Sequence, residues 1–195
     1  MKKSQVTVSE LAEKKRDKHF PIKFKDYAIE YAADRDVYYK EQMKIFKKVF
    51  PPGVSFTPNK KEDKALDSCY REYRKIHSER FLITHKGKVV GWMQGEMEDF
   101  ETFYMRNTGI LPAHQDKGVY KKFLAEFEKY IFGLGYARIS SQHAPTNARI
   151  ISLKLKAKYV IVGSETHERW GKLIKLVKFK LSLIHISEPT RPLYI

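Results

Sequence analysis

One stretch of the sequence limits the folds open to this chain more than any other feature. It runs from Thr102 to Phe132 and has the pattern of a strand, a short loop and an amphipathic helix. The apolar stripe that predicts the helix consists of Val119, Phe123, Leu124, Phe127, Ile131 and Leu134, while Lys121, Lys122, Glu126 and Glu128 fall elsewhere. Gly133 and Gly135 are expected to end this helix. The loop 115–120 before it would present free backbone N–H groups at a positive helix end, which predicts an anion site suited to phosphate.

Length and composition favour one domain. The chain has 195 residues, 42% of them hydrophobic, so it can bury one good core. Its single cysteine, Cys69, allows no intramolecular disulfide and no cysteine metal cluster, which indicates a reducing compartment such as the cytoplasm. No signal peptide or membrane-spanning run is visible. The formal charge of +15 suits an anionic cofactor, nucleic acid or an acidic membrane face, and charge alone does not choose among them.

The two ends of the chain differ from its middle. Residues 1–22 form a basic lead-in with one helical segment near Val8 to Lys18, and a solvated face or frayed end is favoured there over an RNA-binding arm. Residues 23–180 would form the single domain. The segment Leu181 to Arg191 resembles a translated sequencing adapter, so residues 181–195 are interpreted as a non-native tail.

The pattern of apolar residues predicts an α+β fold. Helices are expected over 36–50, with Tyr39, Met43, Phe46 and Phe50 on one face, and over 63–76, whose aromatic residues are interpreted as core and not as nucleobase-stacking groups. Strands are expected over 23–32, over 80–97 as a hairpin turning at 85–88, and over 102–110, 136–141, 159–165 and 173–179, with a further helix over 147–156. The order is β-α-α-β-β-β-α-β-α-β-β, in a mixed central sheet flanked by helices on both faces.

The loop carries a recognisable motif. Ile110-x-Pro112 followed by Gln115-x-x-Gly118-x-Tyr120 resembles the acetyl-CoA signature of the GNAT superfamily of N-acetyltransferases. Tyr120 stands where that signature has a small residue. The element order and the hairpin before the motif strand also resemble the family, over about residues 23 to 180.

The resemblance implies acetyl-CoA as the acyl donor and names residues that would bind it. Backbone groups of Ile110 and Leu111 would pair with the pantetheine arm, and Asn147 would contact the pantetheine or adenosine side or cap a helix. The N–H donors to the pyrophosphate would come from Gln115, Asp116, Lys117, Gly118, Val119 and Tyr120, with Lys117 or nearby lysines meeting the other phosphate.

The catalytic groups are harder to assign from the sequence. The family places a general-acid tyrosine seven residues after the asparagine, where this chain has Lys154. Water, Ser152 or Tyr104 would then protonate the CoA thiolate. Glu98 and Glu101 are candidate bases acting through water, or solvated loop charges. The histidines His114, His143 and His167 have no metal-ligand spacing and are interpreted as surface or loop residues.

Two functions follow from this reading. The first is an N-acetyltransferase that moves an acetyl group from acetyl-CoA to a primary amine by direct attack. The alternative is an inactive domain of the same fold that docks nucleic acid or a ribonucleoprotein through its basic surface. The acceptor stays open among polyamine, aminoglycoside, amino acid and protein N-terminus, and the protein would be a monomer or homodimer with no membrane partner.

Overall fold

The computed structural model describes residues 6–50 and 60–180. Two further expectations from the sequence concern residues that are not described: that Pro51-Pro52-Gly53 ends the helix 36–50, and that Phe56 helps to form a pocket for the acceptor. The tail 181–195, interpreted above as non-native, also lies outside the described residues. Within the part that is described, no helix combines the length and apolar character needed to cross a membrane.

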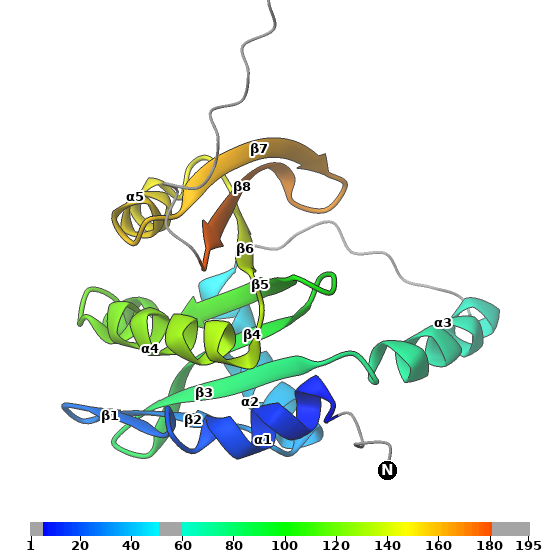
Figure 1. Ribbon diagram of the computed structural model, residues 1–195, viewed down its shortest axis with the longest axis horizontal. Helices are drawn as coiled ribbons and strands as arrows, with labels where there is room; N and C mark the ends of the chain where they lie inside the picture. The colour runs from blue at the N-terminus through cyan, green and yellow to red at the C-terminus, as the bar shows by residue number, and fades with distance from the viewer. Residues whose placement is uncertain (1–5, 51–59, 181–195) are drawn as a thin grey trace, which may run out of the picture.

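An eight-stranded sheet forms the centre of the molecule, with strand order β1-β2-β3-β4-β5-β6-β8-β7 (Figure 1). All neighbours are antiparallel except β5 and β6, which are parallel. The strands are β1 (Ile22–Phe24), β2 (Tyr27–Tyr31), β3 (Ser78–His85), β4 (Lys88–Met97), β5 (Thr102–Ile110), β6 (Arg138–His143), β7 (Val160–His167) and β8 (Gly171–Phe179). The mixed α+β sheet expected from the sequence is confirmed.

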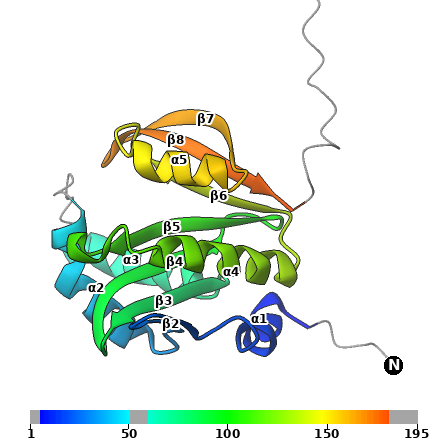
Figure 2. The ribbon, with the colours of Figure 1, turned by 90° about the vertical axis from the view of Figure 1, so that its left-hand side faces the viewer.

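Helices cover both faces of the sheet, as predicted (Figure 2). On one face lie α1, α4 and α5, which pack against the larger buried cluster; on the other, α2 packs over Trp92 of β4. The described helices are α1 (Val8–Arg16), α2 (Arg35–Val49), α3 (Lys60–Tyr73), α4 (Val119–Leu134) and α5 (Ala148–Lys156), with a 3₁₀ turn η1 (Pro112–His114) before α4.

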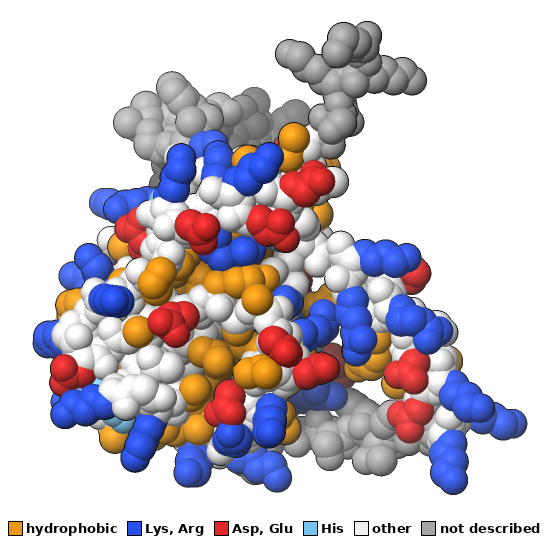
Figure 3. Space-filling view, turned by 90° about the horizontal axis from the view of Figure 1, so that it is seen from below, with side chains coloured by type: hydrophobic (Ala, Val, Ile, Leu, Met, Phe, Trp, Pro, Cys, Tyr) orange, Lys and Arg blue, Asp and Glu red, His pale blue; other side chains and the backbone are white. Residues whose placement is uncertain are grey.

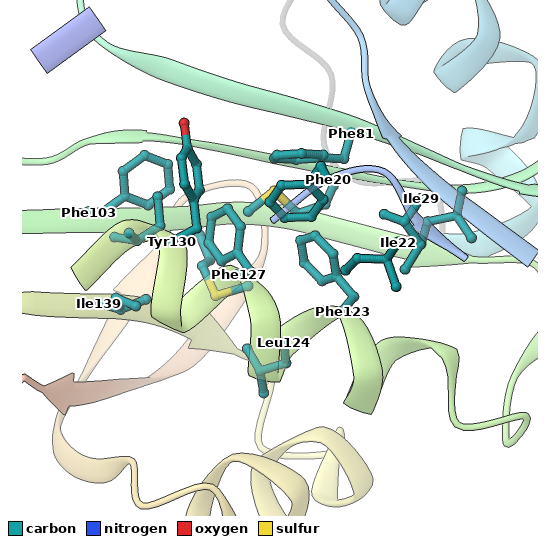
Figure 4. Close-up of a cluster of buried hydrophobic side chains, with 14 of the residues drawn as sticks. Phe20, Ile22, Ile29, Phe81, Phe103, Phe123, Leu124, Phe127, Tyr130 and Ile139 are labelled. Carbon is teal, nitrogen blue, oxygen red and sulfur yellow. The ribbon is translucent and has the colours of Figure 1, made fainter. Parts of the chain in front are cut away.

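The main core lies between α4 and the sheet (Figure 4). Phe123 and Phe127 of α4 are stacked with ring centroids 5.1 Å apart, and Phe103 of β5 meets Phe127 edge-on at 5.6 Å. The predicted apolar stripe of α4 is confirmed, and the helix ends at Gly135 with φ 113°. Glu128, expected on another face, is instead buried, because α5 and β8 cover the flank of α4 on which it lies.

The lead-in helix is packed and not frayed, contrary to expectation. Thr7 and Glu10 form a capping box that starts α1. Ala12 is fully buried, and the Tyr130 hydroxyl of α4 donates to its carbonyl at 3.4 Å. Arg16 pairs with the buried carboxylate of Glu79 at 2.9 Å. This buried ion pair holds α1 against the sheet, which local helical spacing did not reveal.

The turns between strands show that the prediction for 23–32 was wrong and that the prediction of a hairpin over 80–97 was right. The single strand expected over 23–32 is a hairpin of β1 and β2, which turns at Lys25 with φ 54°. The turn between β3 and β4 was predicted correctly. Its central residues Lys86 and Gly87 have φ 49° and 77°, as a two-residue type I′ hairpin requires.

The helices α2 and α3 bury fewer of the expected residues. In α2 the buried side chains are Tyr38, Gln42 and Ile45, and Met43 is 60% exposed. In α3, which projects from the body in Figure 1, no side chain is buried, so the core role expected for its aromatic residues is wrong. Both sequences have helical spacing of apolar residues, but the spacing does not show which face of the helix packs against another element.

Candidate active site

The parallel pair β5–β6 opens into a wedge. The two strands pair only from Thr102 with Arg138 to Met105 with Ser141. Beyond those residues β5 continues beside β4 as far as Ile110, while β6 continues beside β8. The strands therefore separate after Met105 and Ser141, and β5 keeps a backbone edge toward the opening without a strand partner.

At the wide end of the wedge, Ile110 and Leu111, the two residues expected to pair with the pantetheine arm, differ in their backbone hydrogen bonds. The N–H of Leu111 donates to Val90 O at 2.8 Å, and the Leu111 carbonyl accepts from His114 at 2.8 Å, so Leu111 has no free backbone group. Backbone directions alternate along a strand, which turns the N–H of Ile110 toward the wedge. The Ile110 carbonyl accepts from Gln115 Nε2 at 2.9 Å. Ile110 fits the expected pairing role and Leu111 does not.

The loop between η1 and α4 has the form of an anion site. Gly118 is the N-cap residue of α4 with φ 81°, a conformation that glycine adopts readily. The first backbone bond of the helix runs from the N–H of Lys122 to Gly118 O at 3.0 Å. The N–H groups of residues 118–121 therefore precede the intrahelical ladder and point out of the helix end.

The side chains of two residues predicted to bind the pyrophosphate, Gln115 and Asp116, instead hold the loop in place. Asp116, at φ 59°, forms an ion pair with Arg149 of α5. Gln115 Oε1 accepts from the same arginine at 3.2 Å while its amide nitrogen holds Ile110. Lys117 is exposed and remains available to an anion. Arg149 was not singled out in the sequence, yet it ties α5 to the loop.

Tyr120 does not block the loop. Its ring packs toward the core, 6.5 Å from the ring of Phe123, and burial raises the pKa of its hydroxyl. Asn147, the N-cap residue of α5, is exposed and makes no side-chain capping bond. The side-chain amide of Asn147 is thus available for a ligand. The helix-capping role considered for this side chain is not observed.

Glu98 and Glu101 are both engaged by cations. Glu98 bonds Lys175 at 2.7 Å and accepts from Ser140 Oγ at 2.5 Å. Glu101 pairs with Arg138 at 2.7 Å, in the loop that precedes the paired end of β5. These contacts give each carboxylate a structural partner.

Tyr104 lies at the apex of the wedge, where β5 and β6 begin to separate, and on the α2 side of the sheet. It precedes Met105 and donates to Gln142 Oε1 at 2.9 Å. Burial, the largest cause, together with nearby carboxylates raises its pKa to about 12, despite the opposing charge of Arg106. Of the sequence-predicted catalytic residues, Tyr104 is the one placed beside the opening.

Glu96 of β4 was missed by the sequence reasoning. It is 4% exposed and forms an ion pair with Arg106, while its second oxygen has no hydrogen-bond partner among the described residues. The Tyr73 hydroxyl of α3 lies beside it, and burial followed by this carboxylate raises the pKa of that phenol. A charged residue inside an apolar strand was the available signal.

The histidines singled out in the sequence have hydrogen-bond partners in the structure. No group of histidine, cysteine and carboxylate residues able to hold a metal occurs within 6–50 and 60–180. His114 accepts or donates a bond with the Tyr27 hydroxyl at 3.0 Å, and His167 receives the N–H of Arg169 at 3.1 Å. On the face seen in Figure 3, lysine and arginine side chains are interspersed with acidic ones.

Comparisons with known proteins agree with this geometry. The sequence model of the acetyltransferase (GNAT) family matches residues 40–155. The ribosomal-protein-S5-alanine acetyltransferase of Vibrio fischeri has a similar structure, with TM-score 0.57 and 15% identity over 81% of this chain and 95% of that one. The spermidine N-acetyltransferase of Vibrio cholerae gives TM-score 0.59 and 14% identity over 85% and 100%.

A third similar structure has the donor bound. It is a GNAT family acetyltransferase of Elizabethkingia anophelis with acetyl-CoA, at TM-score 0.52 and 13% identity over 80% of this chain and 99% of that one. No curated protein matches the sequence. At these identities the structures establish the fold, while the family match also covers the wedge, the loop and most of α5. The chain belongs to the acetyltransferase (GNAT) family, whose acyl donor is acetyl-CoA.

Proposed function

We propose that this protein transfers an acetyl group from acetyl-CoA to a primary amine, which attacks the thioester directly. The observation that carries the proposal is the wedge between β5 and β6, which opens onto the outward N–H groups of residues 118–121. A phosphate at this loop and an extended arm along the free edge of β5 would place a thioester near Met105. In this arrangement Ile110, Lys117, Gly118, Val119, Tyr120 and Asn147 would contact the donor.

The acceptor would approach from the opposite face of the sheet. That face carries Tyr104, Glu96 and the Gln94 amide, which donates to the Tyr39 hydroxyl of α2 at 3.1 Å. A protonated amine must lose its proton before it attacks. Glu96 is better suited to accept that proton through water than Glu98 or Glu101, because it lies within β4 directly opposite Tyr104, whereas Glu98 and Glu101 lie in the loop after β4.

The direct test measures thiol release from acetyl-CoA in the presence of amines. Suitable acceptors are spermidine and a peptide with a free N-terminal alanine, the kinds of amine named for the similar Vibrio enzymes. We expect amine-dependent release that Glu96→Gln lowers by about 10²-fold or more, within the range of general base catalysis. The exposed Glu168→Gln is the matched control. Failure to bind acetyl-CoA at millimolar concentration would refute the proposal.

A further inference from the structure

Lys154 of α5 is a fully buried lysine in a chemically unusual position. Its Nζ lies 3.1 Å from Met105 Sδ and 4.2 Å from the centroid of the Tyr159 ring. Within the described residues it forms no ion pair with a carboxylate. Buried lysines are rare unless paired, so a side chain held in this way requires an explanation.

Side chains from α4, β6, β8 and the residue before β7 surround Lys154. Glu128 of α4 faces it but is already paired with Lys178 of β8. His143 of β6 and the phenol of Tyr159 complete the surroundings. Desolvation, the largest effect, together with Lys178 outweighs Glu128 and lowers the pKa of Lys154 to about 7. Both the ammonium and the amine are therefore populated near neutral pH.

Its contact with Met105 places Lys154 at the apex of the wedge. Met105 is the last residue of β5 that pairs with β6, and the strands separate immediately beyond it. The side chain of Met105 belongs to the buried cluster on the α4 and α5 side, whereas Tyr104 beside it faces the other way. Lys154 thus approaches the apex from the α5 side, opposite the proposed acceptor face.

We propose that Lys154 is the general acid that protonates the CoA thiolate as it leaves. The assignment rests on the proposed function. The amine nitrogen bonds to the thioester carbonyl carbon, and the carbon–sulfur bond then breaks with its electron pair moving to sulfur. The Lys154 ammonium gives its proton to that sulfur, while the amine nitrogen loses a proton to water or Glu96. Solvent then reprotonates Lys154, and the products are an amide and CoA thiol.

The two groups have pKa values close enough to exchange a proton. A thiol has an unperturbed pKa of about 8.5, within two units of the pKa of about 7 of the Lys154 ammonium, so a proton can pass from the ammonium to the thiolate as that thiolate forms. Tyr104, with a pKa raised to about 12, is a weaker acid and already donates to Gln142. Ser152 lies on the exposed side of α5.

The test titrates the thiol of bound CoA by the ultraviolet absorbance of its thiolate, which requires no acceptor. An ammonium within about 4–6 Å lowers the pKa of an acidic neighbour by about 1–3 units. We expect thiolate to appear at least about one pH unit lower in the wild-type complex than in Lys154→Met. Lys156→Met, an exposed lysine of the same helix, should titrate like the wild type.

Two outcomes overturn the assignment in distinguishable ways. If CoA binds all three proteins and the thiol titrates identically, Lys154 does not act on the sulfur, and the proposed function survives. If CoA binds none of them, both proposals fail together. With an amine that is turned over, Lys154→Met should lower kcat by about 10²-fold or more and leave the KM for acetyl-CoA unchanged, since only the proton donor is removed.

Discussion

Replacing Lys154 with methionine should stabilise the fold and change its response to pH. In the unfolded chain the Lys154 ammonium has its ordinary pKa of 10.5, whereas burial lowers the pKa in the folded protein to about 7. Each unit corresponds to 1.36 kcal/mol, so below pH 7 the buried lysine destabilises the fold by about 5 kcal/mol. Methionine has a similar unbranched stem and no charge to desolvate.

The sign of the pH effect follows from proton binding. Between pH 7 and 10.5 the unfolded chain binds more protons at this position than the folded protein, so the free energy of unfolding rises with pH. Between pH 7 and 9.5 the gain should be about 3 kcal/mol in the wild type. The buried tyrosines, whose pKa values are raised in the folded protein, oppose this gain only near the top of the window, because tyrosine in the unfolded chain ionises near its ordinary pKa of 10.0.

The assay is urea unfolding at pH 7 and pH 9.5 for the wild type, Lys154→Met and Lys156→Met. We expect the wild type and Lys156→Met to become more stable as the pH rises, whereas Lys154→Met loses most of that gain and is already more stable at pH 7. An unfolding free energy that stays flat or falls with pH in the wild type would show that Lys154 is charged and solvated, contrary to the packing described.

Three further predictions concern the fold around the site. Phe127→Ala should lower the free energy of unfolding by about 3–5 kcal/mol in urea titrations, because it empties the stacked aromatic core. Burial, followed by the charge of Lys154, lowers the pKa of His143 to about 3. The free energy of unfolding should therefore fall as the pH drops below about 6.5, because the unfolded chain binds a proton there that the folded protein does not. In His143→Gln the difference in unfolding free energy between pH 6.5 and pH 5 should be smaller than in the wild type. Arg16→Met should destabilise the protein by about 3–5 kcal/mol in the same assay, since it leaves the carboxylate of Glu79 buried without its cation; a change below about 1 kcal/mol would contradict the packing of α1.

The sequence predicted correctly those features whose conformation is determined by a few neighbouring residues. The α4 stripe, the turn at Lys86-Gly87 and the loop glycine Gly118 each have a conformation that their own residues dictate. The apolar face of α3 shows the limit, because its spacing indicates a helix without saying whether another element covers it. The hairpin turn at Lys25 was missed since it lacks the usual glycine.

The polar residues of the site depend on tertiary structure. Glu96 and Lys154 are ordinary charged residues in the sequence, and both are buried only because of the tertiary structure. Leu111 was assigned to the donor by its position after Ile110, but the bond from its N–H to Val90 depends on the pairing with β4. Spacing therefore located the loop, and strand register decided which backbone groups remain free.

The most direct test of the account is calorimetric titration of acetyl-CoA into the wild type, Gly118→Trp and Gly133→Trp. Tryptophan at position 118 would strain a backbone at φ 81° and cover the loop, whereas a Cβ atom at the exposed position 133, near the other end of α4, meets no neighbouring atom within 4 Å. The account predicts binding by the wild type and Gly133→Trp and none by Gly118→Trp. Equal binding by all three would place acetyl-CoA elsewhere, and equal absence of binding would mean that the loop before α4 is only a turn.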